Sequence, residues 1–140
     1  MKVAKWILIS AAAYVGLVAF VETGLGVFQP ELARSGFSML VITTTDESGA
    51  SQDRRLARME SGGQLYVSSH HWPRGWYLRA LENPEVKVDI DGVTRDYTAV
   101  PVRGDEYARV VAEWPIPLRM QFVMGFAPRN LLRLDPQSSR

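Results

Sequence analysis

The residue types best suited to chemistry are concentrated in one short segment, which reads HHWPRGWY from His70 to Tyr77. Tryptophan and tyrosine offer large planar surfaces with a polar edge, and the guanidinium of Arg74 is a forked donor for an anionic group. The segment is therefore suited to form a wall against a flat, anionic ligand. Packing of Trp76 and Tyr77 in a protein core explains the same residues equally well, and the residues alone leave both interpretations open.

Three arginines form a second candidate group, at positions 54, 55 and 58. In an extended strand Arg54 and Arg58 share one face and Arg55 lies on the other, because side chains alternate. Two of the three could therefore converge on a phosphate. A solvated strand face is the plainer alternative.

The two histidines, His70 and His71, are adjacent, so in an extended backbone they point to opposite faces and do not chelate one metal ion. The chain has no cysteine, and it lacks a nucleophile elbow, a phosphate-binding P-loop and a dinucleotide fingerprint. These observations predict no metal site and exclude several enzyme classes.

Composition bounds the architecture that must position these residues. The 140 residues fit one globular domain, and 46% of them are hydrophobic. The net charge is only +1, so no basic field exists to bind nucleic acid by counterion release.

The N-terminal segment is the local exception to this ordinary composition. Sixteen residues from Trp6 to Val21 carry no charge and follow Lys2 and Lys5. We expect residues 1–28 to form a single-pass membrane anchor helix, with a cleaved signal peptide or a buried helix as alternatives. No small-residue cleavage site follows the run. The two lysines favour a location of the domain outside the cytoplasm.

Beyond Gly36 the pattern changes to short apolar runs that are separated by turn residues, which is typical of a small antiparallel barrel. Asp91-Gly92 is the strongest hairpin signal. Strands are expected at 38–45, 52–59, 64–69, 86–90, 93–102 and 130–134, and helices at 75–82, 104–114 and 118–126.

Four stretches in this order carry a family resemblance: TTTDESGASQDRRL, GGQLYVSS, WYLRALENPEV and LLRLDP. Together they resemble the deazaflavin-dependent nitroreductases and quinone reductases, which are flavin-binding split β-barrels similar to pyridoxamine-phosphate oxidases. The resemblance covers about residues 37–136. It implies a mainly β fold with short helices, a six-stranded antiparallel split β-barrel over residues 29–140.

The resemblance also implies a function and partners. The cofactor would be the deazaflavin coenzyme F-420 or FMN, and the acceptor a quinone, such as a membrane quinone, or a nitroaromatic compound. Family members of this kind work in the cytoplasm, in contrast to the indication of the lysines. Barrels of this family commonly pair, so we expect a homodimer, with membrane lipid contacting only the N-terminal helix.

Carried over residue by residue, the resemblance assigns no catalytic residue but implies a set that binds the cofactor. The family's turn between the first two strands is basic, whereas Asp46, Glu47 and Gln52 occupy those positions here. The cofactor-binding residues that it implies are Ser48, Gly49, Gln52, Arg54, Arg55, Ser68, Ser69, His70, Arg74, Trp76 and Tyr77.

Two other classes of function remain as alternatives. The barrel could bind haem or another planar or lipophilic ligand without turnover, or it could be a membrane-tethered interaction domain. The acidic turn favours these alternatives, because like charges repel the phosphate of a coenzyme. The intact spacing from Trp76-Tyr77 to Asn83-Pro84 favours the reductase.

Overall fold

A computed structural model describes residues 2–27, 38–72 and 75–137 of the chain. The predicted boundary between anchor and domain, at residues 28 and 29, and the candidate Arg74 lie outside the described residues. The elements, in chain order, are α1 (Lys2–Val27), β1 (Met39–Thr45), β2 (Ser51–Ala57), β3 (Met59–Ser61), β4 (Gln64–Ser69), α3 (Gly75–Glu82), β5 (Glu85–Ile90), β6 (Val93–Pro101), α4 (Gly104–Glu113), α5 (Leu118–Val123) and β7 (Asn130–Pro136).

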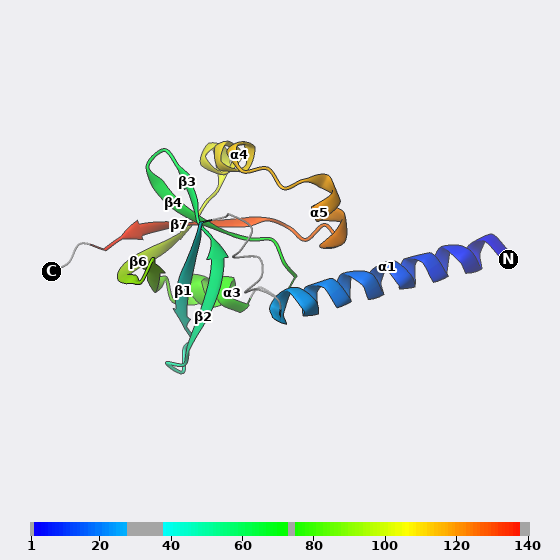
Figure 1. The fold of residues 1–140 in the computed structure, drawn as a ribbon, viewed down its shortest axis with the longest axis horizontal. Helices are drawn as coiled ribbons and strands as arrows, with labels where there is room; N and C mark the ends of the chain where they lie inside the picture. Colours follow the sequence, from blue (N-terminus) through cyan, green and yellow to red (C-terminus); the bar gives the residue numbers. More distant parts are fainter. Residues whose placement is uncertain (1, 28–37, 73–74, 138–140) are drawn as a thin grey trace.

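The strands form one antiparallel sheet in the order β2-β1-β5-β6-β7-β4-β3, which curls into a half-barrel (Figure 1). The prediction of six strands is wrong: the described residues form seven, because the expected strand 52–59 divides at Arg58. The Arg58 amide donates to the carbonyl of Ser38 at 2.9 Å, and β3 then pairs with β4. The chain thus passes from one edge of the sheet, β2, to the other edge, β3.

Several local predictions are confirmed. Helix α3 has the predicted bounds, and β5 and β6 form a hairpin whose turn is Asp91-Gly92. Both turn residues have a positive φ, 53° and 84°, as a two-residue hairpin requires. Asp followed by Gly adopts this conformation at low cost, which explains why the signal was readable from the sequence.

The inner face of the half-barrel holds the main hydrophobic core. Leu40 and Ile42 of β1 point inward with the alternation that their strand predicts, and both are buried. Helix α3 closes this face with Trp76 and Ala80, which are four residues apart and therefore lie on one side of the helix. The helix is thereby fixed beside the hairpin end of β1.

A second, smaller core lies on the opposite face of the sheet, beneath α4. It is formed by Met59, Tyr66, Val102, Val110 and Leu131. Because alternate residues of β4 and β7 serve the two cores, these central strands are buried on both faces.

Helix α5 is shorter than the predicted 118–126, because Gly125 and Phe126 leave the helical conformation with φ values of 64° and 51°. The Phe126 amide donates to the carbonyl of Gln121 at 2.8 Å, which satisfies a carbonyl at the end of the helix.

Helix α1 extends away from the barrel, and its C-terminal half lies beside α5 (Figure 1). The Tyr14 hydroxyl donates to the carbonyl of Phe122 at 2.9 Å, and the two rings are 4.9 Å apart. The stretch Val3–Gly24 is long and apolar enough to cross a membrane. Within it, none of the 18-residue window that meets this test is buried. A helix of this length rises roughly 33 Å.

Candidate functional site

Two sets of polar side chains lie on the inner face of the sheet. The first, which we call the cationic set, consists of Arg54, Arg79 and Thr44. Arg54 lies on β2 opposite Ile42 and shares the inner face with the buried Leu56. The Arg79 Nε donates to the hydroxyl of Thr44 at 3.1 Å. Both guanidinium groups therefore belong to the face that α3 covers.

The guanidinium of Arg79 also lies over the first turn of α3. A Cβ atom placed on Gly75 would be only 3.2 Å from the Arg79 NH1, so a side chain at Gly75 would crowd the guanidinium. Arg79 was not among the residues predicted from the sequence. Its face could have been inferred from the spacing of Trp76 and Ala80, which places α3 on the sheet.

Arg55 lies on the outer face, so the prediction that Arg54 and Arg55 point to opposite sides is confirmed. It lines a shallow cavity of about 420 Å³ together with Asp89 and Asp91. Two carboxylates make this cavity a poor receptor for an anion. The prediction that Arg58 continues the strand face of Arg54 is wrong, because Arg58 lies beyond β2 and its guanidinium pairs with Glu60.

In the acidic turn between β1 and β2, the carboxylate of Asp46 is hydrogen-bonded within the turn itself. One oxygen of Asp46 accepts hydrogen bonds from the amides of Ser48 and Ala50, both at 2.9 Å, and from the Ser48 hydroxyl at 2.6 Å. The Ser48 hydroxyl is the main cause of a lowered pKa of Asp46, and the charge of Arg79 adds to it. Gly49, with a φ of 86°, completes this exposed turn.

The second set, which we call the donor pair, is uncharged and consists of Ser69 and Asn130. These residues face each other where β4 ends and β7 begins. Ser69 is 3% exposed, and the Asn130 side-chain nitrogen is buried without a hydrogen-bond partner among the described residues. A buried donor without a partner is unfavourable, so this atom is suited to receive an oxygen atom of a ligand.

Behind the donor pair, Ser68, His70 and Arg129 form a cluster on the other face of β4. The Ser68 hydroxyl lies 3.3 Å from the His70 Nδ1 and accepts a hydrogen bond from the Arg129 Nε at 3.1 Å. Burial, and then the charges of His71 and Arg129, lower the pKa of His70 to about 4. His70 is therefore a neutral imidazole near pH 7.

The expectation that the two histidines point to opposite faces is wrong, because the chain leaves the strand after Ser69. The ring centroids lie only 4.7 Å apart, with the ring planes tilted by 34°. The His71 Nδ1 lies 3.3 Å from a carboxylate oxygen of Glu22 on α1. No group of three or more His, Asp or Glu side chains that could hold a metal ion occurs in the part of the chain that the structure describes.

Of the predicted aromatic wall, Trp76 is only 7% exposed and packs in the inner core. Tyr77 is half-buried, contacts that core and meets Trp76 edge to face, with ring centroids 6.0 Å apart. Little of Trp76 remains to contact a ligand, so the core-packing interpretation describes this residue better. Gln52 is exposed on β2, opposite Thr44.

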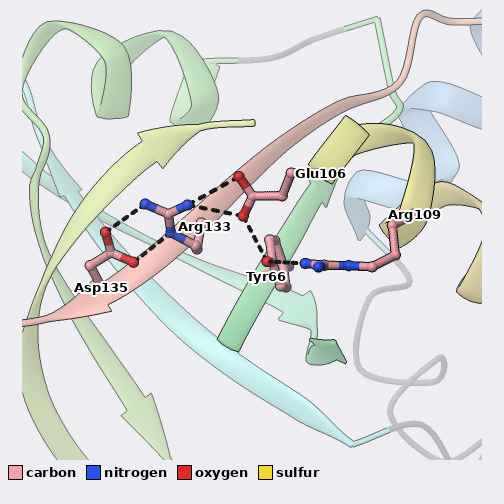
Figure 2. A network of polar contacts seen from close by, with 5 residues as sticks. All are labelled: Tyr66, Glu106, Arg109, Arg133 and Asp135. Carbon is pink, nitrogen blue, oxygen red and sulfur yellow. Dashed lines mark hydrogen bonds and ion pairs between the residues drawn. The ribbon is translucent and has the colours of Figure 1, made fainter. Parts of the chain in front are cut away.

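A third polar network lies on the outer face, where Tyr66 and Arg133 contact Glu106 of α4. Figure 2 shows Glu106 between them, with hydrogen bonds of 2.7 Å from the Tyr66 hydroxyl and 2.9 Å from the Arg133 NH1. These bonds lower the pKa of Glu106, and burial raises that of Tyr66. Arg133 also pairs with Asp135. The network attaches α4 to the sheet.

The curled antiparallel sheet with short helices defines the class of split-barrel proteins. Similar solved structures include one described as "Structure of F420-H2 Dependent Reductase (FDR-A)", 22% identical with a TM-score of 0.56, over 70% of this chain and 94% of that one. A structure described as a domain-swapped dimer is 23% identical with a TM-score of 0.56, over 70% and 80%. The heme storage protein HutZ from Vibrio cholerae is 20% identical with a TM-score of 0.53, over 79% and 89%.

At these identities the similar structures show the fold alone. The family is shown by the sequence: residues 25–120, well over half of the chain, match the family model F420H(2)-dependent quinone reductase. The chain belongs to this family. The match extends from the end of α1 through most of the barrel to α5.

Proposed function

We propose that the protein is a membrane-anchored reductase that uses the deazaflavin coenzyme and passes a hydride to a quinone-type acceptor. The observation that carries this proposal is that the cationic set and the donor pair lie on the same, inner face of the sheet. In this proposal the cationic set would bind a phosphate, and the donor pair would bind an uncharged ring.

The residues present fit the coenzyme of the family. Its phosphate-bearing tail needs cations, and Arg54 and Arg79 supply two on the inner face. The carbonyl groups of its ring need donors, which Ser69 and Asn130 supply. The acidic turn opposes binding less than its sequence suggests, because Asp46 accepts three hydrogen bonds within the turn and its charge interacts with that of Arg79.

When bound, the reduced deazaflavin supplies the hydride; the protein supplies position and electrostatics. Arg79 is held in place by Thr44, so its guanidinium is oriented before the ligand arrives. The neutral His70 lies behind the donor pair on the other face of β4, where it adds no charge, and its contact with Ser68 fixes its side chain. Of the cofactor-binding residues that the sequence indicates, we retain Arg54, Ser68, Ser69, His70 and Tyr77 in this proposal. We also retain Ser48, Gly49 and Gln52, in and next to the turn between β1 and β2.

The same proposal covers the architecture around the site. Helix α1 would be the anchor, which would hold the barrel at a bilayer where lipophilic quinones dissolve. Residues 29–140 would form the reductase domain. Among the described residues its edge strands, β2 and β3, each pair on one side only, which suits pairing with a second copy, so we expect a homodimer.

The test is a fluorescence titration of the purified full-length chain with the deazaflavin coenzyme. Arg54→Ala and Arg79→Ala should each raise the Kd by about tenfold, the value of one charge-assisted contact. Arg55→Ala is the matched control, because this arginine lies on the same strand but on the outer face. Equal effects of all three substitutions, or tight binding by Arg79→Ala, would exclude the cationic set as the phosphate site.

Haem binding is a second candidate, favoured by one observation. His70 is a partly buried neutral imidazole, the form of histidine that ligates iron. The same samples titrated with haem decide between the two: a Soret shift that His70→Gln abolishes, with no binding of the deazaflavin, would replace the reductase by a haem carrier.

A further inference from the structure

Helix α5 and the turn that follows it expose large apolar side chains to solvent. Leu118 is 72% exposed, and the other side chains are about half exposed. We call this group the α5 surface; its members are Leu118, Met120, Phe122, Phe126 and the nearby Trp72. Soluble monomers seldom expose a large contiguous apolar patch, so a surface of this kind indicates a partner.

The side chains of the α5 surface lie against one another and against α1. Leu118 and Phe122 are four residues apart and therefore share one face of α5. The Phe122 ring centroid lies 4.9 Å from that of Tyr14 and 6.2 Å from that of Phe126. Phe126 also has a φ of 51°, which is unfavourable for a bulky side chain. Backbone strain of this kind is typical of sites that contact a partner.

Charge and continuity favour a lipid bilayer as that partner. Arg119 is the only charged residue between Trp114 and Arg129, so this stretch offers the phosphate groups of lipids a cation and no carboxylate. The α5 surface also continues through Tyr14 onto α1, whose apolar window is not buried. A bilayer covers both elements, whereas a soluble partner on α5 alone would leave the apolar helix in water.

The position of α5 along α1 determines how α1 lies in this arrangement. The contacts of Tyr14 and Val18 with α5 and the turn after it fall near the middle of the stretch Val3–Gly24. If α1 crossed a bilayer with these contacts intact, Arg119 would lie near the midplane, where a charged side chain is unfavourable. With α5 at the membrane surface, α1 instead runs along that surface.

From these contacts we infer that the α5 surface docks on a phospholipid bilayer, with α1 beside it along the interface. Trp72, Phe122 and Phe126 enter the boundary between headgroups and acyl chains, which aromatic side chains favour. Arg119 meets a lipid phosphate. The inference rests on the membrane anchoring in the proposed function and adds a second membrane contact to it.

The first experiment measures the depth of a nitroxide label in the full-length chain, in vesicles of phosphatidylcholine and phosphatidylglycerol. The label is attached to Leu118→Cys, or to Glu47→Cys as the control, since the chain has no native cysteine. Glu47 is exposed in the turn between β1 and β2, which projects away from α5 (Figure 1). The label at Leu118 should be more accessible to oxygen, which concentrates in lipid, than to a water-soluble nickel chelate, and the label at Glu47 should show the reverse.

Two results of this experiment overturn the inference. If both labels are equally accessible to the nickel chelate, the α5 surface lies in water. If the label at Leu118 is shielded from oxygen and nickel alike, the α5 surface is covered by protein, such as a second copy of the chain.

The second experiment measures partition of the unlabelled full-length chain onto the same vesicles by sedimentation. Leu118→Asp should weaken partition by about tenfold, because it removes an apolar side chain and places a carboxylate against lipid phosphates. Val93→Asp is the matched control at another exposed apolar position, on β6, and should change partition by less than about twofold. Equal effects of the two substitutions contradict docking through α5. Unchanged circular dichroism of Leu118→Asp checks that the variant folds.

A third label, at the exposed Ala12 of α1, separates this inference from the proposed function. If the label at Ala12→Cys lies in lipid but that at Leu118→Cys lies in water, membrane anchoring stands and docking through α5 alone is excluded. If both labels lie in water, the anchoring fails as well. If the labels lie in lipid as expected but the wild type binds no deazaflavin, the reductase proposal fails and the docking surface stands.

Discussion

Among the side chains around β4, we expect His70 to have the largest effect on how the free energy of unfolding depends on pH. Its folded-state pKa of about 4 lies below the ordinary value of 6.5, so the unfolded chain binds the proton more readily. The contribution of His70 to the free energy of unfolding should therefore be complete above about pH 6.5 and decrease as the pH falls toward 4. The loss is at most about 3 kcal/mol, given 1.36 kcal/mol for each pKa unit.

Urea unfolding between pH 4 and 8 measures this dependence, with His70→Gln as the comparison. The carboxylates with lowered pKa values, Asp46, Glu106 and Asp135, also reduce the stability in acid, but they are present in both proteins. The difference between the two stability curves isolates the histidine. Parallel curves from pH 4.5 to 7 would show that His70 titrates as in the unfolded chain.

Glu106 is the acceptor at the centre of the outer network (Figure 2). Glu106→Ala removes the acceptor of the Tyr66 hydroxyl and one partner of Arg133. We expect a loss of about 1–3 kcal/mol in the free energy of unfolding, because the Tyr66 hydroxyl is largely buried. Glu113→Ala, an exposed position on the same helix, should change it by less than about 0.5 kcal/mol. If Glu106→Ala and Glu113→Ala lower the free energy of unfolding by similar amounts in chemical denaturation, the network does not attach α4 to the sheet.

At the scale of elements, the contact between α1 and the barrel depends on Gly125. Gly125→Ala adds a Cβ that meets Val18, and it also forces a side chain into a φ of 64°. The backbone strain costs about 1–2 kcal/mol, and the contact with Val18 must in addition open. We expect α1 to separate from α5 while the barrel remains folded.

The chain has no cysteine, so spin labels at Ala12→Cys and Glu113→Cys report the distance between α1 and the barrel. Gly125→Ala should broaden this distance distribution. Gly63→Ala is the control, because Gly63 also has a positive φ, of 76°, but no atom lies within 4 Å of an added Cβ. Equal distributions in both variants would show that Gly125 does not determine the position of the helix.

Elements with a local cause were predictable from the sequence. Alternation identified β1, Asp91-Gly92 fixed the hairpin, and Asn83-Pro84 ended α3 at Glu82. The division of the expected strand 52–59 was not predictable, because no glycine or proline marks Arg58 and the break follows from the curl of the sheet. The early end of α5 depends on a positive φ at Phe126, which its residue type does not indicate.

The candidate site was predictable to a smaller extent. Strand alternation separated Arg54 from Arg55, but only the burial of Leu56 shows which of them faces inward. Glu22 and His71 are 49 residues apart, and Ser69 and Asn130 are 61 apart, so folding alone brings each pair together. The one advance signal was Glu22 itself, the charge that ends the apolar run at Val21.

At the scale of the whole molecule, α1 contains a stretch, Val3–Gly24, that is long and apolar enough to cross a membrane. If it crosses a bilayer, Leu17→Lys should weaken insertion by about 2.5–3.5 kcal/mol, because a charge enters the hydrocarbon. Carbonate extraction of cell membranes should then leave the wild type and Leu17→Ala in the pellet and release much of Leu17→Lys. Release of the wild type itself would show that α1 does not span the bilayer.

The strand order has a consequence for how the protein is made. Strand β7, the last of the described strands in chain order, lies between β4 and β6 and supplies Leu131, Leu132 and Leu134 to the two cores. A nascent chain that ends before Asn130 therefore contains two separate sheets, β2-β1-β5-β6 and β4-β3, with unpaired edges where β7 belongs. The barrel therefore cannot close until β7 has been synthesised and has left the ribosome.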